Sequence, residues 1–235
     1  MTTLKQRLAD VRQRIQQACQ AAGRDPARVG LLAVSKLQPA QAVRQAQQAG
    51  QQAFGENYVQ EALDKMAALA DLRGAIEWHL IGPLQSNKTR VVAEAFDWVH
   101  SVDRLKIAQR LSEQRPPGLP PLNICLQVNI SGEASKSGLA PEELPDVARA
   151  AAALPRLRLR GLMAIPEPAQ GLEAQRAPLR ALRLLQQQLQ AQGLDLDLDT
   201  LSMGMSDDLE AAVAEGSTMV RVGTAVFGAR SRGAA

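Results

Sequence analysis

The sequence alternates between short apolar runs and segments with helical character. Eight apolar runs occur, and each is followed by a helix or a helix-like segment in which apolar residues recur at three- and four-residue steps. This alternation predicts a parallel sheet whose strands are joined by crossover helices. The runs lie at 30–35, 52–55, 77–81, 97–101, 122–130, 157–165, 200–202 and 219–222.

Eight strand–helix units in 235 residues fit an α/β fold of the (β/α)8 TIM-barrel type. Residues 1–23 precede the first unit, and their apolar spacing predicts an extra N-terminal helix that ends at Gly23. The proline-rich segment 116–121 is a candidate linker, but a break there would leave two half-barrels without complete cores. We therefore expect one domain over 1–235 with a short tail at 229–235, and an open doubly wound sheet is the alternative.

Composition and charge narrow the range of cellular locations and of binding partners that we expect. The chain is 46% hydrophobic with a net charge of +3 and six aromatic residues, which is typical of a globular protein and offers few rings for stacking on bases. No run approaches the roughly 20 residues that span a bilayer, and the N-terminus lacks a signal-peptide core. Cys19 and Cys125 lie in unrelated segments, which favours reduced thiols. We expect a cytoplasmic monomer that binds neither nucleic acid nor membranes.

Lys36 stands at the position where TIM barrels carry function. Functional side chains collect at the carboxyl ends of the strands, and the first apolar run ends at Val34 and Ser35, directly before this lysine. An amine at the end of a buried strand loses hydration, which lowers its pKa and favours reaction with an aldehyde. Lys36 is therefore a candidate Schiff-base lysine. The alternative is a lysine whose ammonium group extends into solvent.

The loops after the last two runs have the composition of a phosphate site. Ser202 and Ser206 lie between the seventh run and its helix, and Arg221, Gly223 and Thr224 end the eighth run. TIM barrels bind phosphate groups with these two loops and a helix N-terminus. Helix capping and an ordinary turn are the alternatives. A phosphate site on the same rim as a reactive lysine indicates a phosphorylated aldehyde, of which pyridoxal 5'-phosphate is the common cellular example.

Two other kinds of site are disfavoured. The segment 82–89 approaches the phosphate loop G-x-x-x-x-G-K-[ST], but Asn87 stands where a glycine is required and Pro83 stiffens the loop. We therefore do not expect nucleotide hydrolysis. The two histidines and two cysteines occur at no ligand spacing, so we expect no metal site. His79, taken alone, is more typical of a buried or rim histidine than of a catalytic base.

Seven segments together resemble the pyridoxal phosphate homeostasis protein family. The most specific is WHLIGPLQSNK at 78–88. The resemblance covers nearly the whole chain and implies a barrel similar to the N-terminal domain of alanine racemase, with pyridoxal 5'-phosphate bound as a lysine aldimine. The other segments are 33–36, 54–61, 135–138, 160–165, 201–208 and 219–228.

The resemblance also implies roles for individual residues. Lys36 would carry the cofactor, and Arg221 would face the pyridine nitrogen. A fixed cation there disfavours protonation of the ring and weakens the cofactor as an electron sink. The phosphate would be held by Ser206, Gly223 and Thr224 with backbone groups of Ser202 and Met205, while Asn57 would lie near the ring and its phenolic oxygen and Met203 and His79 would border the pocket.

The sequence departs from the family pattern beside the candidate lysine. Many relatives carry a second lysine two positions further on, whereas Leu37 and Gln38 follow here. A role for an extra lysine in cofactor transfer is therefore in doubt at that position. Lys136 is the remaining candidate for an accessory amine, and its alternative is a solvated loop lysine.

We expect a binding protein of vitamin B6 homeostasis that buffers pyridoxal phosphate or delivers it to apo-enzymes, with no catalytic residues. An amino-acid racemase is the alternative. It needs acid–base groups on both faces of the reacting carbon, and Tyr58, the single tyrosine, is expected to point away. The eight units also leave no residues for the further β-rich domain that such a racemase would require. A barrel isomerase using His79 and Glu56 is a less favoured third hypothesis.

Overall fold

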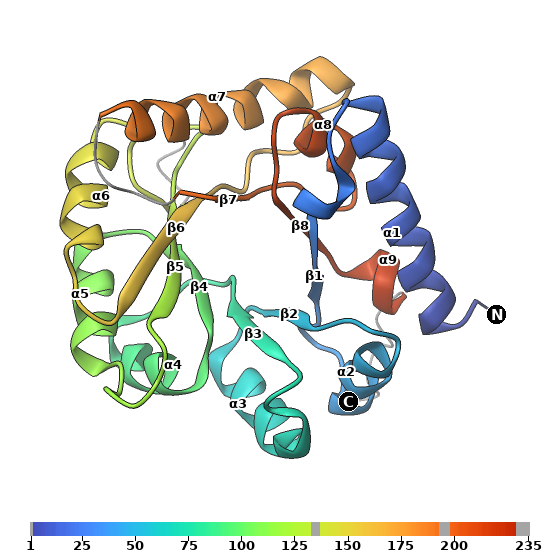
Figure 1. Ribbon diagram of the computed structural model, residues 1–235, viewed down its shortest axis with the longest axis horizontal. Helices are drawn as coiled ribbons and strands as arrows, with labels where there is room; N and C mark the ends of the chain where they lie inside the picture. The colour runs from blue at the N-terminus through green and yellow to red at the C-terminus, as the bar shows by residue number, and fades with distance from the viewer. Residues whose placement is uncertain (1, 133–136, 193–197, 229–235) are drawn as a thin grey trace.

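Eight parallel strands form a closed barrel in the computed structural model, which describes residues 2–132, 137–192 and 198–228. The strands follow one another around the barrel in chain order, and β1 pairs with β8 to close it (Figure 1). Helices surround the barrel (Figure 1). This arrangement confirms the predicted (β/α)8 fold and excludes the open sheet, which would have two unpaired edge strands.

The elements follow the predicted alternation closely. The strands are β1 (Gly30–Val34), β2 (Ala53–Glu56), β3 (Glu77–Leu80), β4 (Trp98–Val102), β5 (Leu122–Gln127), β6 (Leu157–Met163), β7 (Thr200–Ser202) and β8 (Met219–Val222). The helices are α1 (Leu4–Ala21), α2 (Ala40–Gln48), α3 (Val59–Ala68), α4 (Thr89–Ala95), α5 (Leu105–Gln114), α6 (Leu144–Ala152), α7 (Leu172–Ala191), α8 (Leu209–Ala214) and α9 (Thr224–Phe227).

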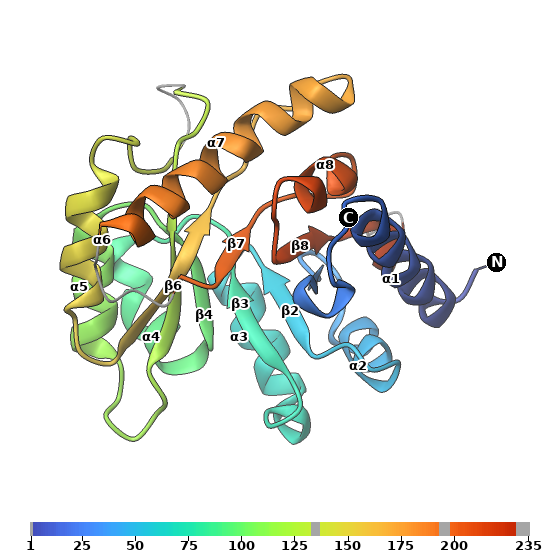
Figure 2. The same cartoon turned by 45° about the horizontal axis from the view of Figure 1, so that its top comes forward.

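The predicted N-terminal helix is present as α1 and packs against α8 and α9 (Figures 1 and 2). The side chain of Thr3 accepts a hydrogen bond from the backbone N–H of Gln6, which caps the helix start. One face of α1 is buried through Leu8, Val11 and Ile15. The helix thereby joins the beginning of the chain to its last two helices, as the amphipathic spacing of residues 3–22 predicts.

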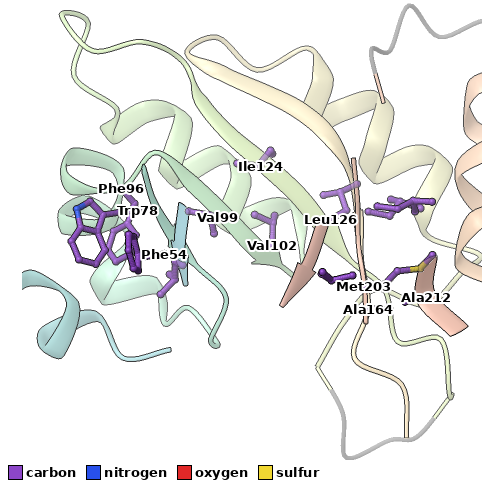
Figure 3. Packing of buried hydrophobic residues seen from close by; sticks show 14 of the residues in the cluster. Phe54, Trp78, Phe96, Val99, Val102, Ile124, Leu126, Ala164, Met203 and Ala212 are labelled. Atoms are coloured by element: carbon purple, nitrogen blue, oxygen red, sulfur yellow. The ribbon is translucent and has the colours of Figure 1, made fainter. Parts of the chain in front are cut away.

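The apolar core lies between the strands and the surrounding helices. Alternate strand residues face this layer because successive side chains point to opposite faces of a sheet. The rings of Phe54 and Trp78 lie with their centroids 6.1 Å apart, and Phe96 belongs to the same buried cluster (Figure 3). A separate small cluster of Trp98, Cys125 and Met163 is buried apart from the main core.

The fifth and sixth strands end earlier than the apolar runs that predicted them. The run at 122–130 yields a strand to Gln127, after which Val128 forms an isolated parallel bridge with Leu139. The run at 157–165 likewise yields a strand to Met163. Val128 and Ala164, which follow these ends, are buried. Among the described helices, none is both long and apolar enough to cross a membrane.

The sixth strand depends on a glycine at a close approach of two backbones. Gly161 pairs with Cys125 on one side and with Thr200 on the other, at a point where the register between β5 and β6 shifts. A Cβ atom built on Gly161 would overlap the carbonyl oxygen of Thr200. Any larger residue must therefore push β6 and β7 apart.

We predict that Gly161→Ala destabilises the fold by about 2 kcal/mol or more, since the overlap falls on backbone rather than on a flexible side chain. Gly74→Ala is the matched control, because no neighbouring atom lies within 4 Å of the added methyl group. Its effect should stay within about 0.5 kcal/mol. Urea unfolding of both variants measures the difference, and equal midpoints would contradict the prediction.

Candidate functional site

A cavity of about 450 Å³ lies at the carboxyl ends of the strands. This is the end at which TIM barrels bind ligands. The structure places most of the sequence-predicted site residues around this cavity. Six of the nine line it: Lys36, Asn57, Ser206, Arg221, Gly223 and Thr224.

Lys36 lies two residues after Val34, the last residue of β1, and belongs to a tight turn. The backbone N–H of Ser35 continues the sheet by donating to the carbonyl of Gly55, and the N–H of Gln38 donates back to the carbonyl of Ser35. Leu37 has a φ of +61°, a left-handed conformation that is costly for a residue with a Cβ atom. Its N–H donates to the Glu61 carboxylate at 2.5 Å, which holds the turn in this shape.

A buried ion-pair cluster stabilises the same turn. Glu56 and Lys65 are buried, and the lysine Nζ lies 2.8 Å from Glu56 Oε1, 2.6 Å from the carbonyl oxygen of Ser35 and 2.6 Å from Glu61 Oε1. The hydroxyl of Ser35 also donates to Glu56 Oε1 at 2.6 Å. Burial raises the pKa of Glu56, while the charge of Lys65 opposes that rise. The cluster connects β2 and α3 to the turn after β1, in which Lys36 lies.

The loops after β7 and β8 form the predicted phosphate end of the cavity. Met205 donates its backbone N–H to Asp208 Oδ1 at 2.6 Å, which shapes the turn that presents Ser206. Gly223 immediately precedes α9, and a Cβ atom there would come within 3.3 Å of the carbonyl oxygen of Val34. The last strand can therefore approach the first closely, which places this end of the cavity beside the turn that carries Lys36.

Arg221 supplies a buried cation to the cavity. It lies on β8 and donates from Nη2 to the carbonyl of Ala164 at 2.8 Å and from Nη1 to the hydroxyl of Ser202 at 2.8 Å. Burial lowers the pKa of Arg221 to about 10. The guanidinium group therefore stays charged at neutral pH, and its hydrogen bonds fix its orientation.

Asn57 contributes an acceptor that lacks a partner. Its Oδ1 atom is buried and receives no hydrogen bond in the structure. Asn57 directly follows β2, and its backbone packs so closely on Gly82 that a Cβ atom on that glycine would overlap it. An unsatisfied buried acceptor costs about 1–3 kcal/mol, so a ligand that donates a hydrogen bond here would recover that energy.

Three predicted residues are buried and absent from the lining of the cavity. His79 and Ser202 are hydrogen-bonded to His100 and Arg221, and Met203 has its carbonyl bound by the hydroxyl of Ser217. The roles implied for His79 and Met203 at the border of the pocket, and for Ser202 in holding the phosphate, stay predictions. Lys136 lies outside the described residues, as does the tail at 229–235.

Sequence reasoning missed the apolar walls and the supporting charges. Ile81 and Ile165 line the cavity one and two residues after their strands, a position that signals a rim residue but not its contact with a ligand. The i,i+4 pair of Lys65 with Glu61 is visible in the sequence, but its contacts with Glu56 and the carbonyl of Ser35 come from other elements and carry no local signal. Tyr58 is 56% exposed and does not line the cavity, and neither does Glu56. Within the described residues, no group of three or more potential metal ligands occurs.

Comparisons with known proteins agree with this geometry. Residues 7–231 match the family model described as the alanine racemase N-terminal domain. A pyridoxal phosphate homeostasis protein of Pseudomonas aeruginosa is 67% identical over 234 residues, covering 100% of this chain and 99% of that protein. A protein of the same name from Escherichia coli K12 is 54% identical over 231 residues, covering 98% of both chains.

Solved structures give the same picture. PipY of Synechococcus elongatus PCC7942, described with PLP bound, is 41% identical and superposes with a TM-score of 0.85 over 96% of this chain and 100% of that chain. The alanine racemase of Corynebacterium glutamicum is 19% identical with a TM-score of 0.61, covering 96% of this chain and 62% of that one. The second similarity concerns the fold alone.

We predict that Lys65→Met destabilises the fold by about 3–5 kcal/mol at neutral pH, because it leaves the Glu56 carboxylate buried without its cation. Lys106→Met on α5 removes an exposed lysine and is the matched control. Urea unfolding measures both variants.

The pH dependence of the Lys65→Met variant provides a second test. Loss of the lysine removes the interaction that opposes the raised pKa of Glu56. A carboxyl whose folded-state pKa is raised supports the fold below its unfolded pKa and loses that contribution as the pH rises. The deficit relative to the parent protein should therefore be smallest at acid pH and grow toward pH 7, and a deficit that is constant with pH would contradict the assignment.

Proposed function

The chain belongs to the pyridoxal phosphate homeostasis proteins, within the wider family of the alanine racemase N-terminal domain, and from this membership we propose that it binds pyridoxal 5'-phosphate in the cavity at the carboxyl end of the barrel. The observation that carries the proposal is the convergence of a strand-end lysine, a buried arginine and a hydroxyl-bearing loop on one cavity.

The residues present fit this cofactor. A cavity of about 450 Å³ lies within the range of roughly 300–1,000 Å³ that is common for small-molecule sites. Ser206 and Thr224 offer hydroxyl groups for a phosphate, and Ile81 and Ile165 offer apolar surface for the faces of a ring. The orphaned Oδ1 of Asn57 can accept a hydrogen bond from a phenolic hydroxyl. The fit therefore covers the charged, the polar and the apolar parts of the molecule.

Lys36 is proposed to hold the cofactor covalently. Pyridoxal phosphate supplies an aldehyde that reacts with amines and a ring that withdraws electrons. In Schiff-base formation a C=N bond joins Lys36 Nζ to the aldehyde carbon, and the aldehyde oxygen leaves with two protons as water. The reverse reaction with water restores both partners, so this attachment suits storage and release.

Arg221 is proposed to face the ring nitrogen with a permanent positive charge. The guanidinium group has donors and no acceptor, so it can donate to an unprotonated nitrogen and opposes a proton there. The hydrogen bonds to Ser202 and Ala164 prevent the group from turning aside. This arrangement stabilises binding while it weakens the withdrawal of electrons that carbanion chemistry requires.

We accordingly propose a role in pyridoxal phosphate homeostasis, by buffering or by delivery to apo-enzymes, without catalysis. The name shared by the close relatives supports that role. Racemisation would need a second acid–base group opposite Lys36. Tyr58 does not line the cavity, and Asp207, which does, directly follows Ser206 at the proposed phosphate end.

The proposal extends to the state of the protein in the cell. We propose that one barrel domain carries the whole site and that it acts as a cytoplasmic monomer. Cys19 and Cys125 are buried free thiols, which is compatible with a reducing compartment.

We predict that Lys36→Ala abolishes the visible absorbance band of the lysine-bound cofactor, because Lys36 is the one lysine among the described residues that line the cavity. Lys106→Ala, an exposed lysine on α5, should keep the band. Borohydride reduction of the parent protein should fix the cofactor on the peptide that contains Lys36, as read by mass spectrometry. A label on a different lysine would refute the assignment.

We predict no amino-acid racemisation at enzymatic rates by the loaded protein. Enzymes commonly turn over about 1–1,000 substrate molecules per second. Chiral chromatography of alanine and other amino acids after incubation measures the conversion, with an authentic alanine racemase as the positive control. Turnover at about 1 per second or faster would replace the carrier function by the racemase alternative.

A further inference from the structure

A continuous chain of hydrogen-bonded side chains crosses the interior of the barrel. It begins at Glu77, the first residue of β3, and ends at Arg221 in the wall of the cavity. The successive distances are 3.2 Å from Glu77 Oε2 to His79 Nε2, 2.9 Å from His79 Nδ1 to His100 Nε2, 2.8 Å from His100 Nδ1 to Ser202 Oγ, and 2.8 Å from Ser202 Oγ to Arg221 Nη1. Four strands, β3, β4, β7 and β8, contribute its members.

The hydrogen-bonded chain is shielded from solvent along its length and exposed to solvent at one end. His79, His100 and Ser202 are fully buried. Trp98 stacks on His79 with ring centroids 5.3 Å apart, and it donates from Nε1 to the other oxygen of Glu77 at 2.7 Å. The Glu77 side chain is 46% exposed, so solvent reaches the chain at the end opposite the cavity.

With both histidine rings neutral, the two ends determine the direction of every hydrogen bond. Arg221 has only donors, so the Ser202 oxygen accepts from it. The Glu77 carboxylate has only acceptors, so His79 Nε2 carries a proton. A neutral imidazole has one N–H, which leaves His79 Nδ1 as an acceptor and requires a proton on His100 Nε2. His100 Nδ1 then accepts from the Ser202 hydroxyl.

The charges around the chain favour this pattern. Burial lowers the pKa of His100 well below its usual value, and the charge of Arg221 adds to that effect. A proton on His100 Nδ1 would also leave the Ser202 hydroxyl without its acceptor. At the other end, the hydrogen bond with His79 lowers the pKa of Glu77.

The surroundings of Glu77 keep it in the ionised form at neutral pH. A depression of about 530 Å³ at this end is lined by Glu77 together with Arg73, Asp97 and Arg115. Arg73 is paired with Asp97 at 2.7 Å, while Arg115 donates to backbone carbonyls.

Arg160, whose guanidinium carbon lies 4.9 Å from the centre of the Trp98 ring, adds positive charge near Glu77. The carboxylate therefore remains an acceptor for His79.

We propose that His79 and His100 are positioning residues for Arg221, anchored by Glu77 at the opposite end of the barrel. Through the one-directional chain they keep the lone pairs of Ser202 Oγ facing the guanidinium group. The identity of the ligand that Arg221 contacts rests on the proposed function, whereas the direction of the hydrogen bonds does not.

The proton positions can be tested without any cofactor. The sequence contains two histidines, so a nitrogen-15 NMR spectrum of the imidazoles is assigned with His79→Gln and His100→Gln. We expect both rings as neutral Nε2–H tautomers at pH 7. A ring found as the Nδ1–H tautomer or as the imidazolium would overturn the proposal.

The effect on Arg221 is tested with three variants loaded with pyridoxal 5'-phosphate. Glu77→Leu removes the anchor and should mix the tautomers of His79 and raise the dissociation constant about three- to tenfold, the scale of coupling through such networks. Glu77→Gln keeps an acceptor for His79 and should restore most of both properties. Glu94→Leu removes an exposed carboxylate of α4 and should change neither.

The outcomes separate the two proposals. Unchanged affinity in a folded Glu77→Leu protein with mixed tautomers would overturn the positioning role and leave cofactor binding intact. Failure of the parent protein to bind pyridoxal phosphate would overturn the proposed function, while the NMR spectrum would still decide the direction of the chain. Circular dichroism and thermal unfolding verify that each variant is folded.

Discussion

Closure of the barrel between β1 and β8 is the constraint on which the candidate site depends. In that pairing Ala33 lies opposite Val222. Lys36, three residues further along, and Gly223 therefore emerge at the same rim, although 187 positions of sequence separate them. Parallel strands place all of their carboxyl ends on one side. A lysine at one end of the repeat and a phosphate-type loop at the other end can thus meet only because the last strand returns to the first.

Closure also creates an interior that differs chemically from the outer core. The layer between strands and helices holds the large apolar cluster that includes Phe54 and Trp78. The interior instead holds His79, His100 and Ser202, all fully buried. Buried polar groups are costly unless each one finds a partner. Each of these three side chains both donates and accepts within one hydrogen-bonded chain, so the interior tolerates their polarity.

The sequence predicts those features that depend on local pattern. The alternation of runs predicts the barrel, and Lys36 and Thr224 are found because they lie within two residues of the ends of apolar runs. Strands β5 and β6 are shorter than their runs because apolarity continues past the last ladder bond, as at Val128. Lys65 and His100 escape prediction for a different reason. His100 meets Ser202 across 102 positions, and that contact depends on barrel register rather than on any neighbouring residue.

Two buried networks support the two basic residues of the cavity, Lys36 and Arg221, from different directions. The Glu56–Lys65 cluster fixes the turn after β1 and includes the left-handed Leu37, whereas the histidine chain reaches Arg221 across the barrel. Groups that are already in place bind a ligand without the entropic cost of ordering them. A protein that stores a reactive aldehyde needs this rigidity together with a reversible bond. Side chains that are already in place can supply binding affinity, while formation and hydrolysis of one C=N bond govern release. High affinity and release of the cofactor are therefore compatible.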